Sequence, residues 1–187
     1  GRQHKRSSRE SLDCALALQE LVNMGVSNII TFDAHDDRVQ NAIPLEGFDS
    51  VRTAYQMVKA FARREGDPNL FDKDATMIIS PDEGGLNRCN FYASVLGLNL
   101  GCFSKRRDYT RVVNGRNPIV AHDYLGNSVE GKNCIVIDDM IASGDSMFDV
   151  CKQLKEKGAK KIFIFTTFGL FTAGLDKFDE YYAQGMF

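Results

Sequence analysis

The 187-residue sequence predicts an α/β fold in which a parallel sheet is flanked by helices on both faces. Three observations support this prediction. Short, almost wholly apolar segments recur along the chain, as is typical of strands that are buried on both sides. Longer segments between them carry apolar residues at helical spacing. The chain is also long enough to enclose one sizeable core, or one domain and part of another.

In the first half of the chain, helix and strand signals alternate. A helix is expected over residues 10–24, because its apolar residues follow helical spacing and Gly25 stands where helices commonly end. Residues 29–32 predict a short buried strand. A second amphipathic helix is expected at 50–64, and the next strand at 77–80.

The second half repeats this alternation. Its expected elements are, in order, a helix at 86–96, a strand at 101–104 before the basic segment 105–116, a strand at 133–137, a helix that Gly158 ends and a strand at 162–165. The carboxyl ends of parallel strands share one edge of the sheet, and ligands bind there. We therefore expect the polar residues that follow these strands to form the functional site.

Composition and charge exclude several classes of protein. The formal net charge of −2 gives no global attraction to nucleic acid or to a membrane surface. The five cysteines lack C-x-x-C spacing, which indicates reduced thiols and disfavours a structural zinc site. The sequence carries no signal peptide and no transmembrane run, which predicts a cytoplasmic protein. It starts without Met in a charged segment, and this is expected of a fragment.

Residues 134–147 carry the strongest functional signal. Four apolar residues lead into Asp138 and Asp139, and before the next helix comes a loop of Ala142, Ser143, Gly144, Asp145 and Ser146. Small residues let backbone N–H groups approach phosphate oxygens, hydroxyls add donors, and the helix N-terminus adds partial positive charge. The carboxylates repel phosphate, so ribose hydroxyls or a cation are their expected partners. The segment predicts a ribose 5-phosphate site; the alternative is an ordinary strand–turn–helix junction.

Two further strand ends carry groups that could bind a metal ion. Asp33 and His35 follow the strand at 29–32, and Asp82 and Glu83 follow the strand at 77–80. Oxygen ligands with one imidazole suit Mg²⁺, which takes few protein ligands and keeps waters and substrate phosphates in its remaining positions. For His35 the alternative is a hydrogen-bonded structural role.

The basic segment after residue 104 is a candidate for stabilising phosphate charge. Lys105 would act there as a point charge and Arg107 as a bidentate clamp. The alternative is a basic hairpin without a catalytic task.

Together, these segments resemble ribose-phosphate pyrophosphokinase, also called phosphoribosyl pyrophosphate synthetase. The motifs that carry the resemblance are, in order, Arg2-Gln3, Asp33-Ala34-His35, Ser80-Pro81-Asp82-Glu83-Gly84-Gly85 with Arg88, Lys105-Arg106-Arg107 and residues 138–146. Members of that family transfer the diphosphate of ATP to the C1 hydroxyl of ribose 5-phosphate, giving phosphoribosyl pyrophosphate and AMP.

The resemblance implies a role for each motif. Arg2 and Gln3 would contact ATP, His35 and Asp82 would bind Mg²⁺, Lys105 and Arg107 would stabilise the transferring group from a flexible catalytic loop, Asp138 and Asp139 would bind the ribose, and residues 142–146 would hold its 5-phosphate. It also implies two phosphoribosyltransferase-like (type I) domains in a homo-oligomer. Residues 1–47 would end the first domain and 48–187 would form most of the second, so the 187-residue chain need not be active by itself.

The sequence departs from the family pattern in ways that keep two alternatives open. Asp145 replaces a usual Gly and brings a carboxylate close to a phosphate, and Thr167-Phe168-Gly169 replaces a usual Thr-His-Pro. One alternative is a phosphoribosyltransferase, which shares the sugar-phosphate loop. The other is a regulatory homologue that has lost turnover.

Overall fold

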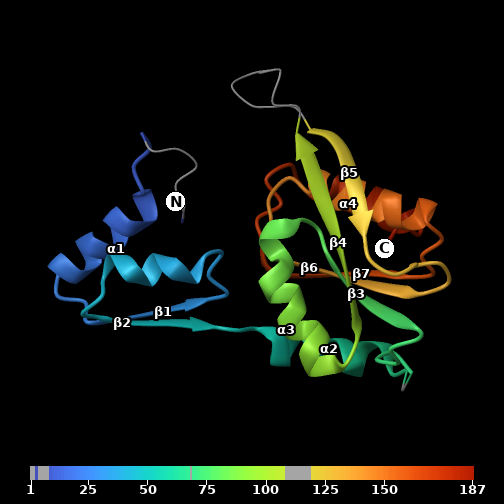
Figure 1. Ribbon diagram of the computed structural model, residues 1–187, viewed down its shortest axis with the longest axis horizontal. Coiled ribbons are helices and arrows are strands. Elements are labelled where there is room, and N and C mark those ends of the chain that lie inside the picture. Colours follow the sequence, from blue (N-terminus) through green and yellow to red (C-terminus); the bar gives the residue numbers. More distant parts are fainter. Residues whose placement is uncertain (1–2, 4–8, 68, 108–118) are drawn as a thin grey trace. The chain divides into compact units, whose positions relative to one another are not determined.

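A computed structural model of the protein describes residue 3 and residues 9–67, 69–107 and 119–187 (Figure 1). The side chains of residues 105–107 and 119–122 lie outside this description. The chain divides into two compact units, Gly1–Tyr55 and Gln56–Phe187. Within the described ranges, none of the helices combines the length and the apolar character needed to cross a membrane.

The described residues of the first unit pair two parallel strands, β1 (Asn28–Phe32) and β2 (Gly47–Val51), beside a helix. That helix is α1 (Asp13–Asn23), and a 3₁₀ turn, η1 (Asp37–Ala42), connects the strands. Leu18, Val39 and Ile43 form the small core between helix and turn. Strand β2 was not expected, because Asp49 and Ser50 interrupt it and it lacks an apolar run.

The described residues of the second unit form a five-stranded sheet in the order β5-β4-β3-β6-β7. The strands are β3 (Thr76–Ser80), β4 (Asn99–Arg107), β5 (Ile119–Leu125), β6 (Asn133–Ile141) and β7 (Ile162–Gly169), and the helical elements are α2 (Ala54–Glu65, which begins at the end of the first unit), η2 (Glu83–Gly85), α3 (Leu86–Leu96), α4 (Asp145–Glu156) and α5 (Asp176–Ala183). The pairs β3–β4, β3–β6 and β6–β7 are parallel, and β4–β5 is antiparallel. The expected parallel sheet is thus confirmed, with one antiparallel strand at its edge.

Helices cover both faces of this sheet. On one face, Met77 and Val136 pack with Val150 and Leu154 of α4 in a buried cluster. On the other face, Phe61 of α2 packs its ring against two rings of β7, with centroid distances of 4.6 Å to Phe163 and 5.1 Å to Phe165. All five residues of β3 are buried, as a central parallel strand requires.

Besides strands β2 and β5, which were not expected, three elements differ from the expectation, and each difference lies at a polar strand end or in a short helix. Strand β6 continues to Ile141 because its backbone pairing with β7 continues past the apolar run, so Asp138 and Asp139 lie in the strand and not after it. Strand β4 includes the basic residues 105–107 because β5 pairs with them. Helix α5 was missed, since it is only eight residues long and half of these are charged.

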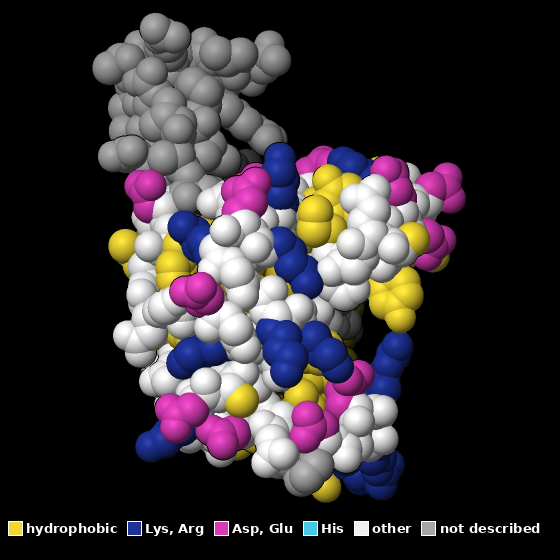
Figure 2. Space-filling view, turned by 90° about the vertical axis from the view of Figure 1, so that its right-hand side faces the viewer, with side chains coloured by type: hydrophobic (Ala, Val, Ile, Leu, Met, Phe, Trp, Pro, Cys, Tyr) yellow, Lys and Arg dark blue, Asp and Glu magenta, His cyan; other side chains and the backbone are white. Residues whose placement is uncertain are grey.

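Surface charge is mixed. On the face shown in Figure 2, Lys and Arg side chains are interspersed with Asp and Glu side chains and with apolar ones. This view agrees with the small net charge of the chain, −2.

Candidate functional site

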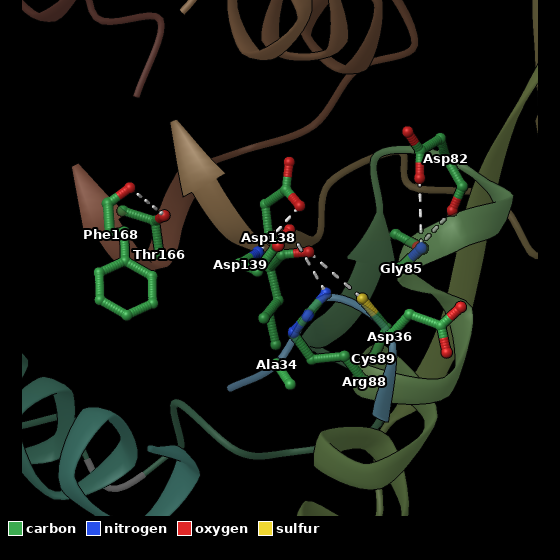
Figure 3. A network of polar contacts seen from close by, with 12 residues as sticks. Ala34, Asp36, Asp82, Gly85, Arg88, Cys89, Asp138, Asp139, Thr166 and Phe168 are labelled. Carbon is green, nitrogen blue, oxygen red and sulfur yellow. Dashed lines mark hydrogen bonds and ion pairs between the residues drawn. The ribbon is translucent and has the colours of Figure 1, made fainter. Parts of the chain in front are cut away.

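Two strands bring acidic side chains to one edge of the sheet. Strands β3 and β6 are parallel neighbours, with Ile79 opposite Val136. Asp82 follows the end of β3, while Asp138 and Asp139 lie in the second half of β6 (Figure 3). The topology therefore confirms that these side chains lie at the edge of the sheet where the parallel strands have their C-terminal ends.

The loop after β3 holds Asp82 in a defined orientation. Its Oδ1 accepts a hydrogen bond from the N–H of Gly85 at 3.2 Å, and its backbone carbonyl accepts one from Ser80 Oγ at 2.7 Å. A Cβ at position 85 would lie 2.9 Å from Ser80 Oγ, so the loop can close this tightly only around glycine. The Ser-Pro-Asp-Glu-Gly-Gly motif thus builds a rigid acidic turn.

A largely buried arginine lies beside the carboxylate pair of β6. Arg88 Nη1 of α3 is 3.8 Å from Asp139 Oδ1, and the Asp139 N–H donates to Asp138 Oδ1 at 2.9 Å. Burial, followed by the hydrogen bond and charge of Asp139, raises the pKa of Asp138 to about 7. Near neutral pH such a carboxyl group can both donate to and accept from sugar hydroxyls.

The loop after β6 is held from two sides. The N–H of Leu170 donates to the carbonyl of Ile141 at 2.9 Å, and the N–H of Thr172 donates to that of Ala142 at 3.0 Å. Gly144 adopts a φ of +91°, and a Cβ there would lie 2.5 Å from Phe178 Cζ. The first backbone N–H groups of α4 follow at once, as a phosphate-binding turn requires.

Asp145, the unusual residue of this loop, is paired. Lys177 Nζ of α5 lies 2.9 Å from Asp145 Oδ1, and Ser143 Oγ donates to Asp145 Oδ2 at 2.9 Å. The hydrogen bond from Lys177 lowers the pKa of Asp145, and the same bond raises the pKa of Lys177. Sequence reasoning did not single out Lys177, because it lies 32 residues from its partner, and no local pattern links the two.

The predicted catalytic residues Lys105 and Arg107 lie in β4, not in a loop. Their backbones pair with those of His122 and Ile119 of β5. The ladder between β3 and β4 ends at Cys102, so β4 carries these residues beyond the end of β3. Nothing is described of their side chains, and residues 108–116 of the basic segment lie outside the described residues.

Just before Lys105, the structure ties β4 to the acidic turn. Ser104 Oγ donates to Glu83 Oε1 at 2.5 Å, which joins the start of the basic segment to the loop of Asp82. Glu83 was expected only as a member of an acidic pair. This hydrogen bond shows that it also connects two strand ends.

The first unit brings two other predicted site segments together. Gln3 Oε1 accepts a hydrogen bond from the N–H of Asp36 at 2.6 Å, next to the exposed His35. In the same loop, Asp33 has a φ of +46°, a conformation that non-glycine residues seldom adopt and that concentrates at functional sites. Arg2 lies outside the described residues.

The predicted metal ligands lie in different units, His35 in the first and Asp82 in the second. In the part of the chain that the structure describes, three or more His, Cys, Asp or Glu side chains do not gather into a group that could hold a metal ion.

Comparison with known proteins links this geometry to one family. Residues 51–184 match the model of the phosphoribosyl transferase domain. The chain is 30% identical to the ribose-phosphate pyrophosphokinase of Ralstonia nicotianae, over 90% of this chain and 49% of the relative, and 30% identical to that of Mycoplasma pneumoniae, over 97% and 52%. A crystal structure of phosphoribosylpyrophosphate synthetase from Mycobacterium smegmatis superimposes with a TM-score of 0.73 at 25% identity, covering 90% of this chain and 50% of that one.

These matches confirm the resemblance that the order of the motifs indicated. They also confirm the α/β fold that the resemblance implied. The chain spans about half the length of the curated relatives it matches.

Proposed function

The chain belongs to the phosphoribosyl transferase domain family, and on that premise we propose that it carries the ribose 5-phosphate site of a ribose-phosphate diphosphokinase. The reaction transfers diphosphate from ATP to the C1 hydroxyl of ribose 5-phosphate and yields phosphoribosyl pyrophosphate and AMP. The observation that carries the proposal is the junction of β6 and α4, where the partly buried Asp138 and the buried Asp139 precede a short loop with Gly144 and the N-terminus of α4.

Each part of this junction suits a different part of the sugar phosphate. Asp138 and Asp139 would bind the ribose hydroxyls, for which carboxyl groups are good hydrogen-bond partners. Residues 142–146 would hold the 5-phosphate through backbone N–H groups and the hydroxyl of Ser146, since the Ser143 hydroxyl donates to Asp145. Arg88 would balance the charge of the carboxylate pair.

Arg2 and Gln3 are proposed to contact ATP. The hydrogen bond between Gln3 and Asp36 supports this role, because it places Gln3 beside the loop of His35. We propose that residues 1–47 end a first phosphoribosyltransferase-like domain, that 48–187 form most of a second, and that the whole protein is a cytoplasmic homo-oligomer.

Mg²⁺ is the proposed cofactor, held by His35 and Asp82. A single imidazole and a single carboxylate fit this ion, since they leave most of its octahedral positions to water and phosphate oxygens. When bound, the ion supplies charge neutralisation for the diphosphate that is transferred.

The protein's part in the chemistry is positioning and charge stabilisation. The C1 hydroxyl attacks phosphorus directly, so no side-chain nucleophile is needed. Lys105 and Arg107 are proposed to stabilise the negative charge that develops on the transferring group. Both residues lie in β4 beyond the end of its pairing with β3, on the side of the sheet where Asp82 follows β3.

The test follows two products made by the whole protein, because the 187-residue chain need not be active by itself, and it measures ribose 5-phosphate binding by calorimetry. AMP formation from ATP and ribose 5-phosphate, abolished by EDTA and restored by Mg²⁺, is the expected result. Pyrophosphate release from phosphoribosyl pyrophosphate and a base, without AMP formation from ATP, would replace the proposal with a phosphoribosyltransferase. Binding of ribose 5-phosphate without either product would identify a homologue that has lost turnover.

A further inference from the structure

An ion pair joins the phosphate loop to the last helix. Lys177 Nζ of α5 lies 2.9 Å from Asp145 Oδ1, at the first residue of α4. The second carboxylate oxygen, Oδ2, accepts from Ser143 Oγ at 2.9 Å. The Asp145 side chain is 70% exposed and that of Lys177 51%, so burial does not force this arrangement.

Aromatic packing fixes the position of Lys177. The ring centroid of Phe148, on α4, lies 4.6 Å from that of Phe178 and 4.5 Å from that of Tyr181, both on α5. Lys177 Nζ itself lies over the Phe148 ring, 5.1 Å from its centroid. Helix α5 therefore docks on the first turns of α4, and this docking presents Lys177 to the loop.

Glycine at position 144 belongs to the same arrangement. A Cβ there would meet Phe178 Cζ at 2.5 Å and Phe148 Cε2 at 2.9 Å, so the loop approaches the helix pair as closely as a backbone can. The loop, the start of α4 and α5 thus form one packed body.

A carboxylate at this place conflicts with a phosphate ligand. Asp145 adds negative charge where a phosphate dianion is proposed to bind, and it already accepts the Ser143 hydroxyl. A free Asp145 side chain could also turn toward the ligand. The bond to Lys177 opposes the repulsion of the phosphate, because it balances the charge of Asp145. It also keeps the side chain from turning toward the ligand.

We propose that Lys177 is a positioning residue of the ribose 5-phosphate site, which holds the Asp145 carboxylate beside α5 and so allows an acidic loop to accept a phosphate. The inference rests on the proposed function, since it needs the 142–146 loop to bind the 5-phosphate. Lys177 acts through Asp145 and need not contact the ligand.

The experiment measures ribose 5-phosphate and ribose binding by calorimetry for the 187-residue chain and its variants. Lys177→Met should weaken ribose 5-phosphate binding about threefold to fivefold, the range typical of exposed charge pairs, and leave ribose binding unchanged. In an Asp145→Asn background the same substitution should cost less than about twofold, because the carboxylate it restrains is gone. Lys177→Arg should retain binding, and Lys152→Met, which removes an exposed lysine farther along α4, is the matched control.

A second readout follows Asp145 directly. The pKa of its carboxyl group, measured by NMR, should rise in Lys177→Met toward the ordinary value for aspartate. An unchanged Asp145 pKa would overturn the inference, since the pair would not exist in solution. Equal losses of ribose 5-phosphate affinity in both backgrounds would also overturn it, since Lys177 would then act on the ligand independently.

The failure of the inference can be told apart from that of the proposed function. If the unsubstituted chain binds ribose 5-phosphate and Lys177→Met binds it equally well, only the role of Lys177 is wrong. If the unsubstituted chain does not bind ribose 5-phosphate, the proposed function fails, and the inference that rests on it fails too.

Discussion

Arg88 and Asp139 form an ion pair at 3.8 Å with side chains that are only 12% and 10% exposed. The pair joins α3 to β6, and Asp139 is one of the two carboxylates that are proposed to bind the sugar. In such a largely buried pair each charge helps to compensate the other, because water is largely excluded.

Removal of Arg88 should therefore destabilise the fold. We expect Arg88→Met to lower the free energy of unfolding by about 3 kcal/mol, since it leaves the buried Asp139 carboxylate without this partner. Urea unfolding measures the effect, and Arg63→Met, at an exposed site on α2, should change stability by less than about 0.5 kcal/mol. An additional Asp139→Asn substitution should recover part of the loss; an Arg88→Met variant as stable as the original chain would contradict the assignment.

The raised pKa of Asp138 predicts a pH dependence of stability. The folded state holds the Asp138 proton up to about pH 7, whereas the unfolded chain releases it near pH 4. Between these values the folded state binds more protons, so the free energy of unfolding falls as the pH rises, by an amount on the order of 4 kcal/mol. Asp138→Asn should flatten this part of the curve, and Asp149→Asn, at an exposed site on α4, should leave it as it was. Parallel curves for Asp138→Asn and the unsubstituted chain would refute the prediction.

Gly144 should not tolerate a side chain. Gly144→Ala is expected to cost about 2–4 kcal/mol of stability, because the φ of +91° is strained for alanine and the new Cβ would meet Phe178. Gly174→Ala is the matched control, since its φ is +81° and a Cβ there meets nothing within 4 Å. Thermal unfolding should show a larger loss at position 144 than at 174, and the excess measures the cost of the clash. Equal losses would mean that only backbone strain matters.

Lys105 should affect turnover more than binding. If it stabilises the transferring diphosphate, Lys105→Ala should lower AMP formation by about 10²-fold or more and spare the affinity for ribose 5-phosphate. Steady-state kinetics and calorimetry separate the two effects, and Lys152→Ala serves as the charge control. Near-normal turnover in Lys105→Ala would remove this residue from the proposed mechanism.

Much of the second unit could be predicted from local pattern. The apolar runs at 77–80, 133–137 and 162–165 became β3, β6 and β7, and the spacing of buried residues in α4 matched its helix. These predictions succeeded because a strand buried on both faces must be apolar at nearly every position. Strands β2 and β5 were missed, because strands with polar residues lack such a run and form through pairing with a neighbour.

The residues of the proposed site likewise divide into those that local pattern predicts and those that only the fold brings together. Asp82 and the pair Asp138–Asp139 could be assigned to one sheet edge from the sequence, because each follows an apolar run and the carboxyl ends of parallel strands share one edge. The contacts of Arg88 and Lys177 could not, because Arg88 reaches across from a helix and Lys177 lies far along the chain from Asp145.

By itself, the sequence determined that this protein is an α/β domain with a glycine turn and two carboxylates at a strand end, because backbone conformation and burial leave local patterns in residue type. Only the tertiary structure decided how the charges of that turn are balanced. Asp145 reads in the sequence as a carboxylate that repels phosphate, and in the fold it is bound to Lys177. The physical reason is that charge compensation depends on distance in space, which here is set by the aromatic packing of α5 on α4.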